Sequence, residues 1–432
     1  MAGEWRELPF SEAVLVNPPV RLERGSRYPF VDMGAVSPGS RCAYATEERE
    51  FSGGGSRFQH GDTLMARITP CLENGKIARF CAREGSGVGH GSTEFIVVRG
   101  RPDITDTDFA YYLAQWEEVR GYAVGQMTGT SGRQRVPTDS LAHLTVPVPP
   151  LPEQLAIAHI LGTLDDKIEL NRRMNETLEA MARALFKSWF VEFEPVRAKA
   201  EGRDPGIPKP LADLFPVRLV DSVLGEMPEG WEVAPLPQLI AVNPQRSLRK
   251  GEIAPYLDMA NMPTRSHAPD EVVDRPFGSG MRFINGDTLV ARITPCLENG
   301  KTAFVDFLRE GQVGWGSTEY IVLRPKPPLP EEFAYCLARS DVFREFAIQS
   351  MTGSSGRQRV PAESLSHFQV VAAPRPIAEL FGRLIKPPFA RASAASKESR
   401  TLAALRDTLL PKLISGDLRV KDAERFVVEA AS

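Results

Sequence analysis

Cysteine is scarce in this sequence, and its spacing is typical neither of a disulfide framework nor of a zinc site. The cysteines form no C-x-x-C pair, and five is an odd number for a set of disulfides. We therefore predict that all are reduced thiols. The six histidines show no metal-ligand spacing either, so the sequence predicts no metal ion. The cysteines in question are Cys42, Cys71, Cys81, Cys296 and Cys336.

Long apolar runs are missing as well. No stretch approaches the ~18 residues that a membrane span requires, and the N-terminal MAGEWRELPF has neither the basic start nor the apolar stretch of a signal peptide. We therefore expect a cytoplasmic protein. A chain of 432 residues with 42% apolar content is long enough to build two or three packed cores.

The sequence also lacks an excess of basic residues, because its formal net charge is −3. Proteins that bind nucleic acid usually carry a positive surplus that follows the phosphates. Any contact with DNA must therefore be local, with basic side chains gathered on one face. A larger partner can then supply the rest of the positive field.

What the sequence does contain is a long repeat. The segment GDTLMARITPCLENGK at 61–76 returns as GDTLVARITPCLENGK at 286–301, with one change in sixteen residues. The period of about 225 residues makes the repeating unit a whole domain. The flanking blocks recur in the same order: VDMGAV (31–36) with LDMANM (257–262), GSTEFIVVR (91–99) with GSTEYIVLR (316–324), and MTGTSGRQRVP (127–137) with MTGSSGRQRVP (351–361).

Each copy mixes short β-like runs, such as EFIVVR, with glycine-rich turns and one helical stretch. The sequence thus predicts an α+β fold, with two similar mixed α/β domains separated by two long antiparallel helices that form a coiled-coil spacer. We assign the first domain to 1–150, the first spacer helix to 151–195, a Pro- and Gly-rich linker to 196–227, the second domain to 228–374, and the second spacer helix with its C-terminal tail to 375–432.

The first spacer helix shows a coiled-coil seam, because its seam residues fall at alternating steps of three and four. The two central asparagines cost stability but can fix the register against a partner helix. Pro195 is expected to end the helix. The seam consists of Leu161, Leu164, Ile168, Asn171, Asn175, Leu178, Ala182, Leu185 and Trp189.

The second spacer helix continues through Leu402, Leu405, Leu409 and Leu413, but Pro387-Pro388 is expected to kink or split it. A helix of about 38 residues at ~1.5 Å per residue spans roughly 55 Å, which exceeds the ~34 Å of one turn of B-DNA. Two domains held at this separation would recognise two short half-sites with an unread gap between them.

Six blocks follow one another along nearly the whole chain: ARITPCLENGK, GSTEF, TSGRQRVP, VPPLPEQ, LFKSWFVEFEPVR and TLAALRDTLLPKLISGDL. In this order they resemble the specificity (S) subunit of type I restriction-modification systems. The resemblance implies two target-recognition domains, each reading half of a bipartite DNA site, and spacer helices that dock two adenine-N6 methyltransferase subunits, with ATP-driven restriction subunits joining them. It implies no cofactor in this chain, because S-adenosylmethionine belongs to the methyltransferase partner and ATP and Mg to the restriction partner.

For the docking of methyltransferase subunits we single out apolar positions on the two spacer helices. Such seams are exposed unless another helix covers them, and the chain is then expected to depend on its partners for stability. The positions are Leu161, Leu164, Ile168, Leu178, Leu185, Trp189, Leu402, Leu405 and Leu409.

The recurring Gly-Arg-Gln-Arg segment is the strongest candidate for DNA contact. Arginine forks bind guanine and glutamine pairs with adenine, so these side chains suit direct readout of bases, or they clamp phosphates. The alternative is that an arginine pairs with Glu94 or Glu319 and holds the domain together. The candidates are Arg133, Gln134 and Arg135 in the first copy, and Arg357, Gln358 and Arg359 in the second.

Other polar residues of the repeated blocks can donate hydrogen bonds to phosphates. The alternatives are a hairpin with Ile68 and Leu72 in the core, and turn caps for the serines and threonines. The candidates are Arg67, Thr69, Lys76, Ser92 and Thr93, and in the second copy Arg292, Thr294, Lys301, Ser317 and Thr318.

The resemblance leaves two interpretations of the repeated blocks open. Either they are framework, and the bases are read by the divergent stretches 37–60 and 263–285, or the two half-sites are related.

Sequences that suggest catalysis fail on inspection. Asn17-Pro18-Pro19-Val20 lacks the aromatic residue of the adenine methyltransferase loop, and no glycine-rich cofactor loop accompanies it. Gly300-Lys301-Thr302 lacks the first glycine of a phosphate loop. We therefore predict that the chain is not an enzyme. A DNA-modifying enzyme acting by itself and a scaffold that never touches DNA are the alternatives.

Overall fold

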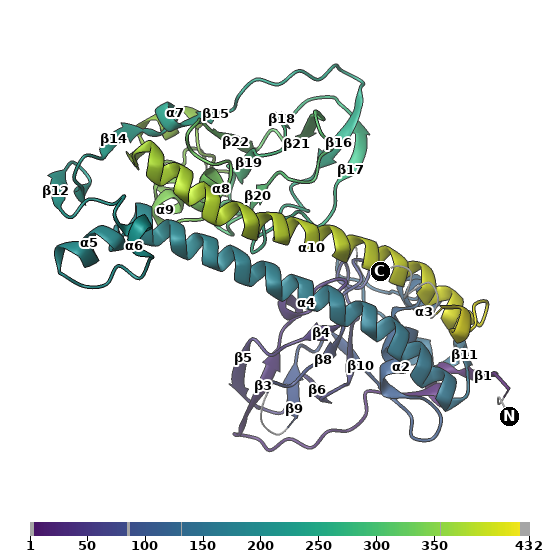
Figure 1. Ribbon diagram of the computed structural model, residues 1–432. Coiled ribbons are helices and arrows are strands. Elements are labelled where there is room, and N and C mark those ends of the chain that lie inside the picture. Colours follow the sequence, from purple (N-terminus) through teal and green to yellow (C-terminus); the bar gives the residue numbers. More distant parts are fainter. Residues whose placement is uncertain (1–3, 84–86, 131, 355, 424–432) are drawn as a thin grey trace. The chain divides into compact units, whose positions relative to one another are not determined.

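The computed structural model describes residues 4–83, 87–130, 132–354 and 356–423 (Figure 1). The chain divides into two compact units. The first runs to Leu170 and resumes at Glu398, and the second spans Asn171–Lys397. Each unit holds one copy of the repeat together with parts of two long helices, α4 (Leu151–Phe190) and α10 (Arg375–Ser415).

The remaining elements of the first unit are β1 (Arg6–Pro9), α1 (Phe10–Ala13), β2 (Val14–Val16), β3 (Arg27–Val31), the 3-10 helix η1 (Met33–Ala35), β4 (Cys42–Ala43), β5 (Glu47–Glu50), β6 (Ser56–Gln59), β7 (Thr63–Ala66), β8 (Ile77–Phe80), β9 (Val88–Gly91), β10 (Phe95–Gly100), α2 (Thr107–Gln115), α3 (Glu117–Gly125), η2 (Thr138–His143) and β11 (Thr145–Val148).

The remaining elements of the second unit are α5 (Glu194–Ala200), α6 (Lys209–Ala212), β12 (Leu219–Ser222), β13 (Gly225–Pro228), β14 (Glu232–Pro235), α7 (Leu236–Leu239), β15 (Ile240–Val242), β16 (Ile253–Leu257), β17 (Val273–Pro276), β18 (Met281–Phe283), β19 (Thr288–Ala291), β20 (Thr302–Phe304), β21 (Gly314–Gly316), β22 (Tyr320–Pro325), α8 (Glu332–Ala338), α9 (Asp341–Gln349), η3 (Ala362–His367) and β23 (Gln369–Ala372).

The two copies of the repeat have matching sheets. The first copy has the strand orders β2-β10-β7-β8-β4 and β5-β3-β9-β6, and the second has β15-β22-β19-β20 and β17-β16-β21-β18. A small sheet closes each copy, β1-β11 in one and β14-β23 in the other. The α+β fold with a repeated mixed domain, predicted from the sequence, is therefore confirmed.

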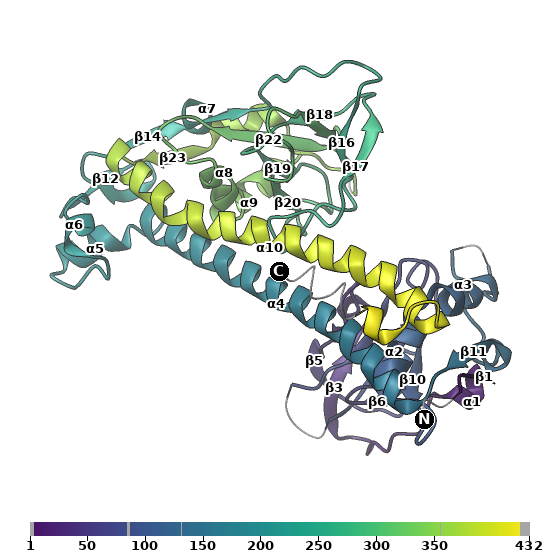
Figure 2. The same cartoon turned by 45° about the vertical axis from the view of Figure 1, so that its right-hand side comes forward.

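The two long helices pack against each other, in opposite directions, inside each unit. In the first unit, α4 and α10 run side by side (Figure 2). Leu161 and Leu164 of α4 share a core there with Leu402 and Leu409 of α10. In the second unit, the rings of Phe186, Trp189 and Phe190 from α4 contact the ring of Phe381 from α10. The early part of one helix thus pairs with the late part of the other, which makes the pairing antiparallel.

The predicted seam is correct in its asparagines and in Ala182 and Trp189, which are all buried, and it deviates at two leucines. Asn171 and Asn175 are buried, and their amide nitrogens donate to Ala395 O at 3.4 Å and to Ser396 Oγ at 2.9 Å on α10. Leu178 and Leu185 are only half-buried, whereas the following residues, Glu179 and Phe186, are buried. A straight α-helix with 3.6 residues per turn drifts relative to a strict heptad repeat, which explains the shift by one residue.

The two prolines Pro387-Pro388 do not split the second helix, because α10 is one helix through both of them. Pro387 is exposed, so the backbone carbonyls that lose their donors face water. On the opposite face Ile385 and Phe389 are buried, and the ring of Phe389 packs against Tyr335. Burial of that face offsets the cost of the lost hydrogen bonds.

The first helix also ends earlier than predicted. It stops at Phe190, and Pro195 lies inside the next helix, α5, at one of its first two positions, where proline is well tolerated. The predicted linker at 196–227 contains the end of α5, then α6 and most of the hairpin β12-β13.

The prediction that every cysteine is reduced is wrong for two of them. Cys42 and Cys81 form a disulfide, whereas Cys71, Cys296 and Cys336 are free thiols. The parallel pairing of β4 with β8 brings the two residues together, with their Cα atoms 5.6 Å apart, across 39 positions of sequence. A spacing of this length carries no sequence signal, because it depends on a long-range strand pairing.

Within the described residues, no helix combines the length and the apolar character that a membrane crossing needs.

Candidate nucleic-acid interface

The Gly-Arg-Gln-Arg segment of each copy lies beside the beginning of the ARITPCLENGK block. Arg135 forms isolated β-bridges with Ile68 and Thr128, and Arg359 forms them with Ile293 and Thr352. The segments therefore occupy the same place in the two copies, as the repeat predicts.

The first arginine of each segment points away from the domain. Arg133 and Arg357 are exposed, and no ion pair of their side chains is found among the described residues. Gln134 and Gln358 are partly buried and hold the segment through their backbones, since Thr69 N donates to Gln134 O at 3.0 Å. Two free guanidinium groups thus stand at equivalent positions, ready to bind phosphate or a guanine edge.

The last arginine of each segment is bound inside its own domain. Arg135 holds the carboxylate of Glu94 with Nε and Nη2, at 2.7–3.0 Å, and this pairing raises the pKa of Arg135. Arg359 pairs with Glu319 through Nε alone, at 2.8 Å. For these two arginines the structure has the intradomain ion pair that was the alternative to DNA contact.

Other candidates from the repeated blocks are also bound within their domains. Lys76 donates to Met33 O at 2.9 Å, and Lys301 donates to Met259 O and Ala260 O. These lysines tie the loop after β3, and its counterpart after β16, to the repeated block.

The hydroxyl groups follow the same trend. Thr69 donates to Met127 Sδ at 3.4 Å, and Thr294 donates to Gln358 O at 3.4 Å. Ser92 and Ser317 accept hydrogen bonds from the backbone N–H two residues later, both at 3.1 Å, so they cap turns. Thr93 and Thr318 are exposed, and within the described part of the chain no hydrogen bond of their hydroxyls is found.

A cleft of about 400 Å³ in the first unit brings Arg67 and Thr93 together with Arg57. No acidic side chain lines it. The Nε atom of Arg67 is buried there without a hydrogen-bond partner among the described residues. Arg57 stacks over Phe51, 4.9 Å from the ring centroid, and donates to Gly53 O at 3.3 Å. In the part of the chain that the structure describes, no acidic side chain pairs with it. An opening lined by donors in this way favours a phosphate or another group rich in acceptors.

Asn17 forms the rim of this cleft, and its role there is structural. It has a left-handed backbone, with φ of 48°, and its side-chain oxygen accepts a hydrogen bond from Val97 N at 2.9 Å. Asn243 repeats the arrangement with Val322 N, also at 2.9 Å. The side-chain oxygen of each asparagine is therefore engaged by a strand of its own domain, whereas a methyltransferase loop would need it to bind the target base.

The second copy arranges the same region differently. Arg282, which corresponds to Arg57, donates to Arg246 O at 2.7 Å, and Arg246 pairs with the buried Asp287 at 3.2 Å. Arg292, the counterpart of Arg67, has its Nε 4.0 Å from Glu319. Burial raises the pKa of Asp287, and the two arginines around it oppose that rise.

The divergent stretches 37–60 and 263–285 supply strands to the same sheet in each copy. In the first copy they contribute β5 and β6, and in the second β17 and β18. Strand β5 is fully exposed and rich in glutamate. An exposed acidic strand would repel phosphates, so the backbone of DNA is not expected to lie along it.

The sequence interpretation missed two groups of residues. Arg57 recurs as Arg282 within the shorter match SRF and MRF, and this recurrence was a usable signal. Arg41 and His267, which join each domain to α4, differ in type between the copies and gave no signal. Among the described residues, no group of three or more side chains suits a metal ion.

Comparison with known proteins supports one family. The family model for the type I restriction modification DNA specificity domain matches residues 58–180. The HindI specificity subunit of Haemophilus influenzae is 24% identical over 373 residues, covering 76% of this chain and 81% of the relative. The MjaIX specificity subunit of Methanocaldococcus jannaschii is 26% identical over 330 residues, covering 73% of this chain and 70% of the relative.

A solved structure supports the fold. The S subunit of a type I restriction-modification system from M. genitalium matches with a TM-score of 0.53 and 14% identity, over 95% of this chain and 96% of that one. The repeated domain, the paired long helices and the sequence matches agree, and they show that this chain is similar to the specificity subunits of type I restriction enzymes.

Proposed function

We propose that this chain reads a bipartite DNA target, one half-site with each copy of the repeated domain, and is not itself an enzyme. The observation that carries the proposal is the exposed pair Arg133 and Arg357, which the repeat places at equivalent positions without an acidic partner among the described residues. An arginine in this state keeps its hydrogen-bond donors free for phosphates or guanine.

The local charge supports contact with DNA in spite of the overall charge of −3. In the first copy, the cleft around Arg57, Arg67 and Thr93 adds donors without an acidic neighbour in its lining. We assign phosphate contact to Arg67, Thr93 and Thr318, and base or phosphate contact to Arg133 and Arg357. Lys76, Lys301, Arg135 and Arg359 then act mainly as framework, since each is bound within its own domain.

The two long helices suit the docking of methyltransferase subunits. The side chains available for this contact are not those of the predicted seam. Leu161, Leu164 and Leu409 are buried between α4 and α10 and are not available to a partner. The large apolar side chains of α4 that are most exposed include Leu155 at 55%, Leu170 at 60% and Met181 at 59%. Exposed apolar side chains of this size on one helix are typical of a surface that a partner covers.

The chemistry then belongs to the partners. Methylation of adenine needs S-adenosylmethionine in the methyltransferase subunits, and cleavage needs ATP and Mg in the restriction subunits. This chain decides where on the DNA those activities are applied.

The experiment is to purify the chain in complex with the methyltransferase encoded beside it and to map methylated adenines over a whole genome. We expect one target with two short specified parts and an unspecified gap of constant length. A contiguous target without a gap would contradict reading by two domains, and a complex that methylates at random would contradict the role in specificity.

A further inference from the structure

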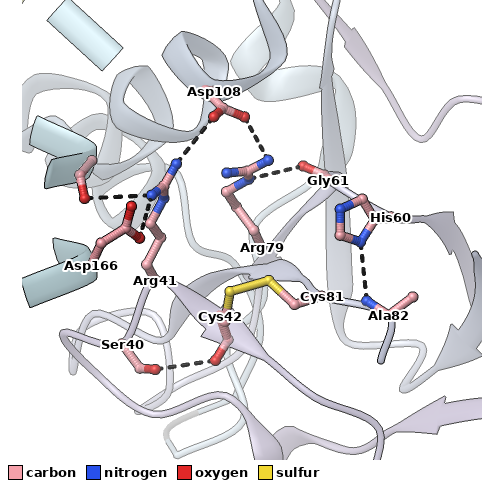
Figure 3. Close-up of a disulfide and its surroundings, with 11 residues drawn as sticks. Ser40, Arg41, Cys42, His60, Gly61, Arg79, Cys81, Ala82, Asp108 and Asp166 are labelled. Carbon is pink, nitrogen blue, oxygen red and sulfur yellow. Dashed lines mark hydrogen bonds and ion pairs between the residues drawn. A yellow bond between two sulfur atoms is a disulfide. The ribbon is translucent and has the colours of Figure 1, made fainter. Parts of the chain in front are cut away.

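The first recognition domain is joined to the helix α4 through Arg41. Its guanidinium reaches Asp166 at 2.8 Å and Gly162 O at 3.5 Å, both on α4, and also Asp108 of α2 at 3.1 Å (Figure 3). Arg79 of β8 completes the group, 2.5 Å from Asp108. Arg41 therefore bridges the sheet, the helix α2 and the helix on which the domain is mounted.

A disulfide lies directly beside this junction. Cys42 follows Arg41, and Cys81 lies two positions after Arg79, so the bond links the same two chain segments that carry the arginines (Figure 3). Strand β4 is an edge strand of only two residues. Its backbone is held to β8 and the residue after it by two hydrogen bonds, Arg79 N to Arg41 O at 2.8 Å and Cys81 N to Ala43 O at 3.0 Å.

An edge strand of two residues is held by few backbone contacts. Two backbone hydrogen bonds hold it on one side, and its other edge has no neighbouring strand. The disulfide removes much of the freedom of this segment and thereby keeps the Arg41 side chain aimed at α4. Both cysteines are half-buried, so neither lies wholly inside the core.

The second copy has the same junction without a disulfide. Phe304 N donates to His267 O at 3.0 Å, as Arg79 N does to Arg41 O, so His267 occupies the place of Arg41. His267 contacts Glu179 of α4 at 2.8 Å and lies 3.2 Å from Asp306, which stands where the first copy has Cys81. The connection that the first copy makes with a covalent bond is thus an ion pair in the second.

We propose that the Cys42–Cys81 disulfide is a redox-controlled staple that holds Arg41, and with it the first recognition domain, on α4. A dithiol reductant opens it by exchange. One thiolate of the reductant attacks a sulfur of the disulfide, forms a mixed disulfide with that cysteine and releases the other cysteine. The second thiol of the reductant then attacks the reductant's own sulfur in the mixed disulfide and releases the first cysteine. Two electrons and two protons pass to Cys42 and Cys81, and the reductant becomes a disulfide.

Reduction of the disulfide should change the recognition of only one half of the DNA target, an inference that rests on the proposed function. With the staple open, the segment around Arg41 loosens, so the first domain is held less firmly and its half-site is read less strictly. The second domain has no cysteine at this junction and keeps its selectivity.

The first experiment needs no DNA. Hydrogen exchange is measured on the full chain before and after dithiothreitol, together with a count of free thiols by mass spectrometry. We expect three free thiols before reduction and five after it, and at least tenfold faster exchange of the amides of Arg79 and Cys81 after it. The amide of Phe304 in the second copy is the internal control and should not change. Finding five free thiols in the untreated protein, or unchanged exchange, would overturn the staple.

The second experiment measures selectivity in the complex with the methyltransferase. Binding to the target is compared with binding to two altered targets, each changed in one half-site, with and without dithiothreitol. Discrimination at the half-site of the first domain should fall several-fold on reduction, and that at the other half-site should stay constant. If both stay constant while exchange changes, the staple has no role in recognition and the proposal is wrong.

Two variants complete the design. The double variant C42S/C81S should behave like the reduced protein with or without dithiothreitol, whereas C71S, which removes a free thiol, should remain sensitive to it. Arg41→Met should lose discrimination at the first half-site, and Arg41→Lys should recover part of it because the charge toward Asp166 is kept. Absence of any sequence-selective binding by the unmodified complex would overturn the proposed function, whatever the exchange data show about the staple.

Discussion

Asp165 of α4 lies 2.7 Å from Arg406 of α10, and both side chains are largely buried. Tyr112 of the first recognition domain donates a hydrogen bond to the same carboxylate, at 2.8 Å. One carboxyl group therefore connects the two helices and the domain they carry. Removing a single partner leaves the other charge buried without compensation, which usually costs more than the intact pair contributes.

Replacing Arg406 by methionine should lower the free energy of unfolding of the first unit by about 3–5 kcal/mol. The value can be measured by denaturant unfolding, with hydrogen exchange at α2 to assign the transition to this unit. Arg400 lies exposed on the same helix and is the matched control, since Arg400→Met should change stability by less than about 0.5 kcal/mol. Equal effects of the two variants would show that the buried pair is not needed.

The stability of the second unit should depend on pH through His267. Burial by itself lowers the pKa of this side chain, but its hydrogen bonds and charge interactions with Asp306 and Glu179 outweigh burial and raise the pKa to about 9. The stabilisation is therefore complete below the unfolded value of ~6.5 and is lost as the pH rises through about 9. The loss is on the order of 3 kcal/mol.

This prediction is tested by denaturant unfolding of the full chain between pH 6 and pH 10. His267→Gln should remove the pH-dependent part, whereas His159→Gln, on the exposed face of α4, should leave it unchanged. The first unit has Arg41 at the equivalent place, which stays protonated throughout, so its transition should not show the same slope. If the free energy of unfolding of the His267→Gln protein fell with pH as steeply as that of the unchanged protein, His267 would not be the group responsible.

Arg133→Ala and Arg357→Ala should each weaken selectivity at a different half-site. If each arginine forms one good base contact, its loss reduces discrimination at that position by about 10- to 100-fold. The measurement is competition binding of the complex with DNA changed in one half-site at a time. Arg375→Ala, at an exposed position on α10, is the control. Should one variant affect both half-sites equally, the arginine binds phosphate and does not read a base.

Asn175→Leu should raise the stability of the second unit by about 1 kcal/mol. The side-chain oxygen of Asn175 is buried without a partner among the described residues, and leucine removes this cost. The amide nitrogen bonds Ser396 on α10, so the gain in stability comes with a weaker preference for one helix register. Denaturant unfolding measures the first effect, and a cysteine placed on each helix for disulfide trapping measures the second. A clear loss of stability would mean that the Asn175–Ser396 hydrogen bond contributes more than the unsatisfied oxygen costs.

The repeat was the most informative property of the sequence. It predicted that Arg133 and Arg357 occupy equivalent places, which the β-bridges of the two copies confirm. The seam was predictable for Asn171 and Asn175 because period and burial coincide there. It was shifted at Leu185, since a strict heptad does not follow 3.6 residues per turn over so long a helix. That each predicted candidate residue contacts DNA remains a prediction.

The sequence by itself determined the duplicated domain and the two long helices, because local residue patterns and long identical blocks encode them. Only the tertiary structure decided which polar side chains are free. Arg133 and Arg135 are two positions apart in one motif, yet one points to solvent and the other binds Glu94, which is 41 positions away. The disulfide between Cys42 and Cys81 likewise depends on contacts between distant segments. The same holds for the ion pairs by which Arg41 and His267 join the two domains to α4. Such contacts form through strand pairing and helix packing, and no local pattern encodes them.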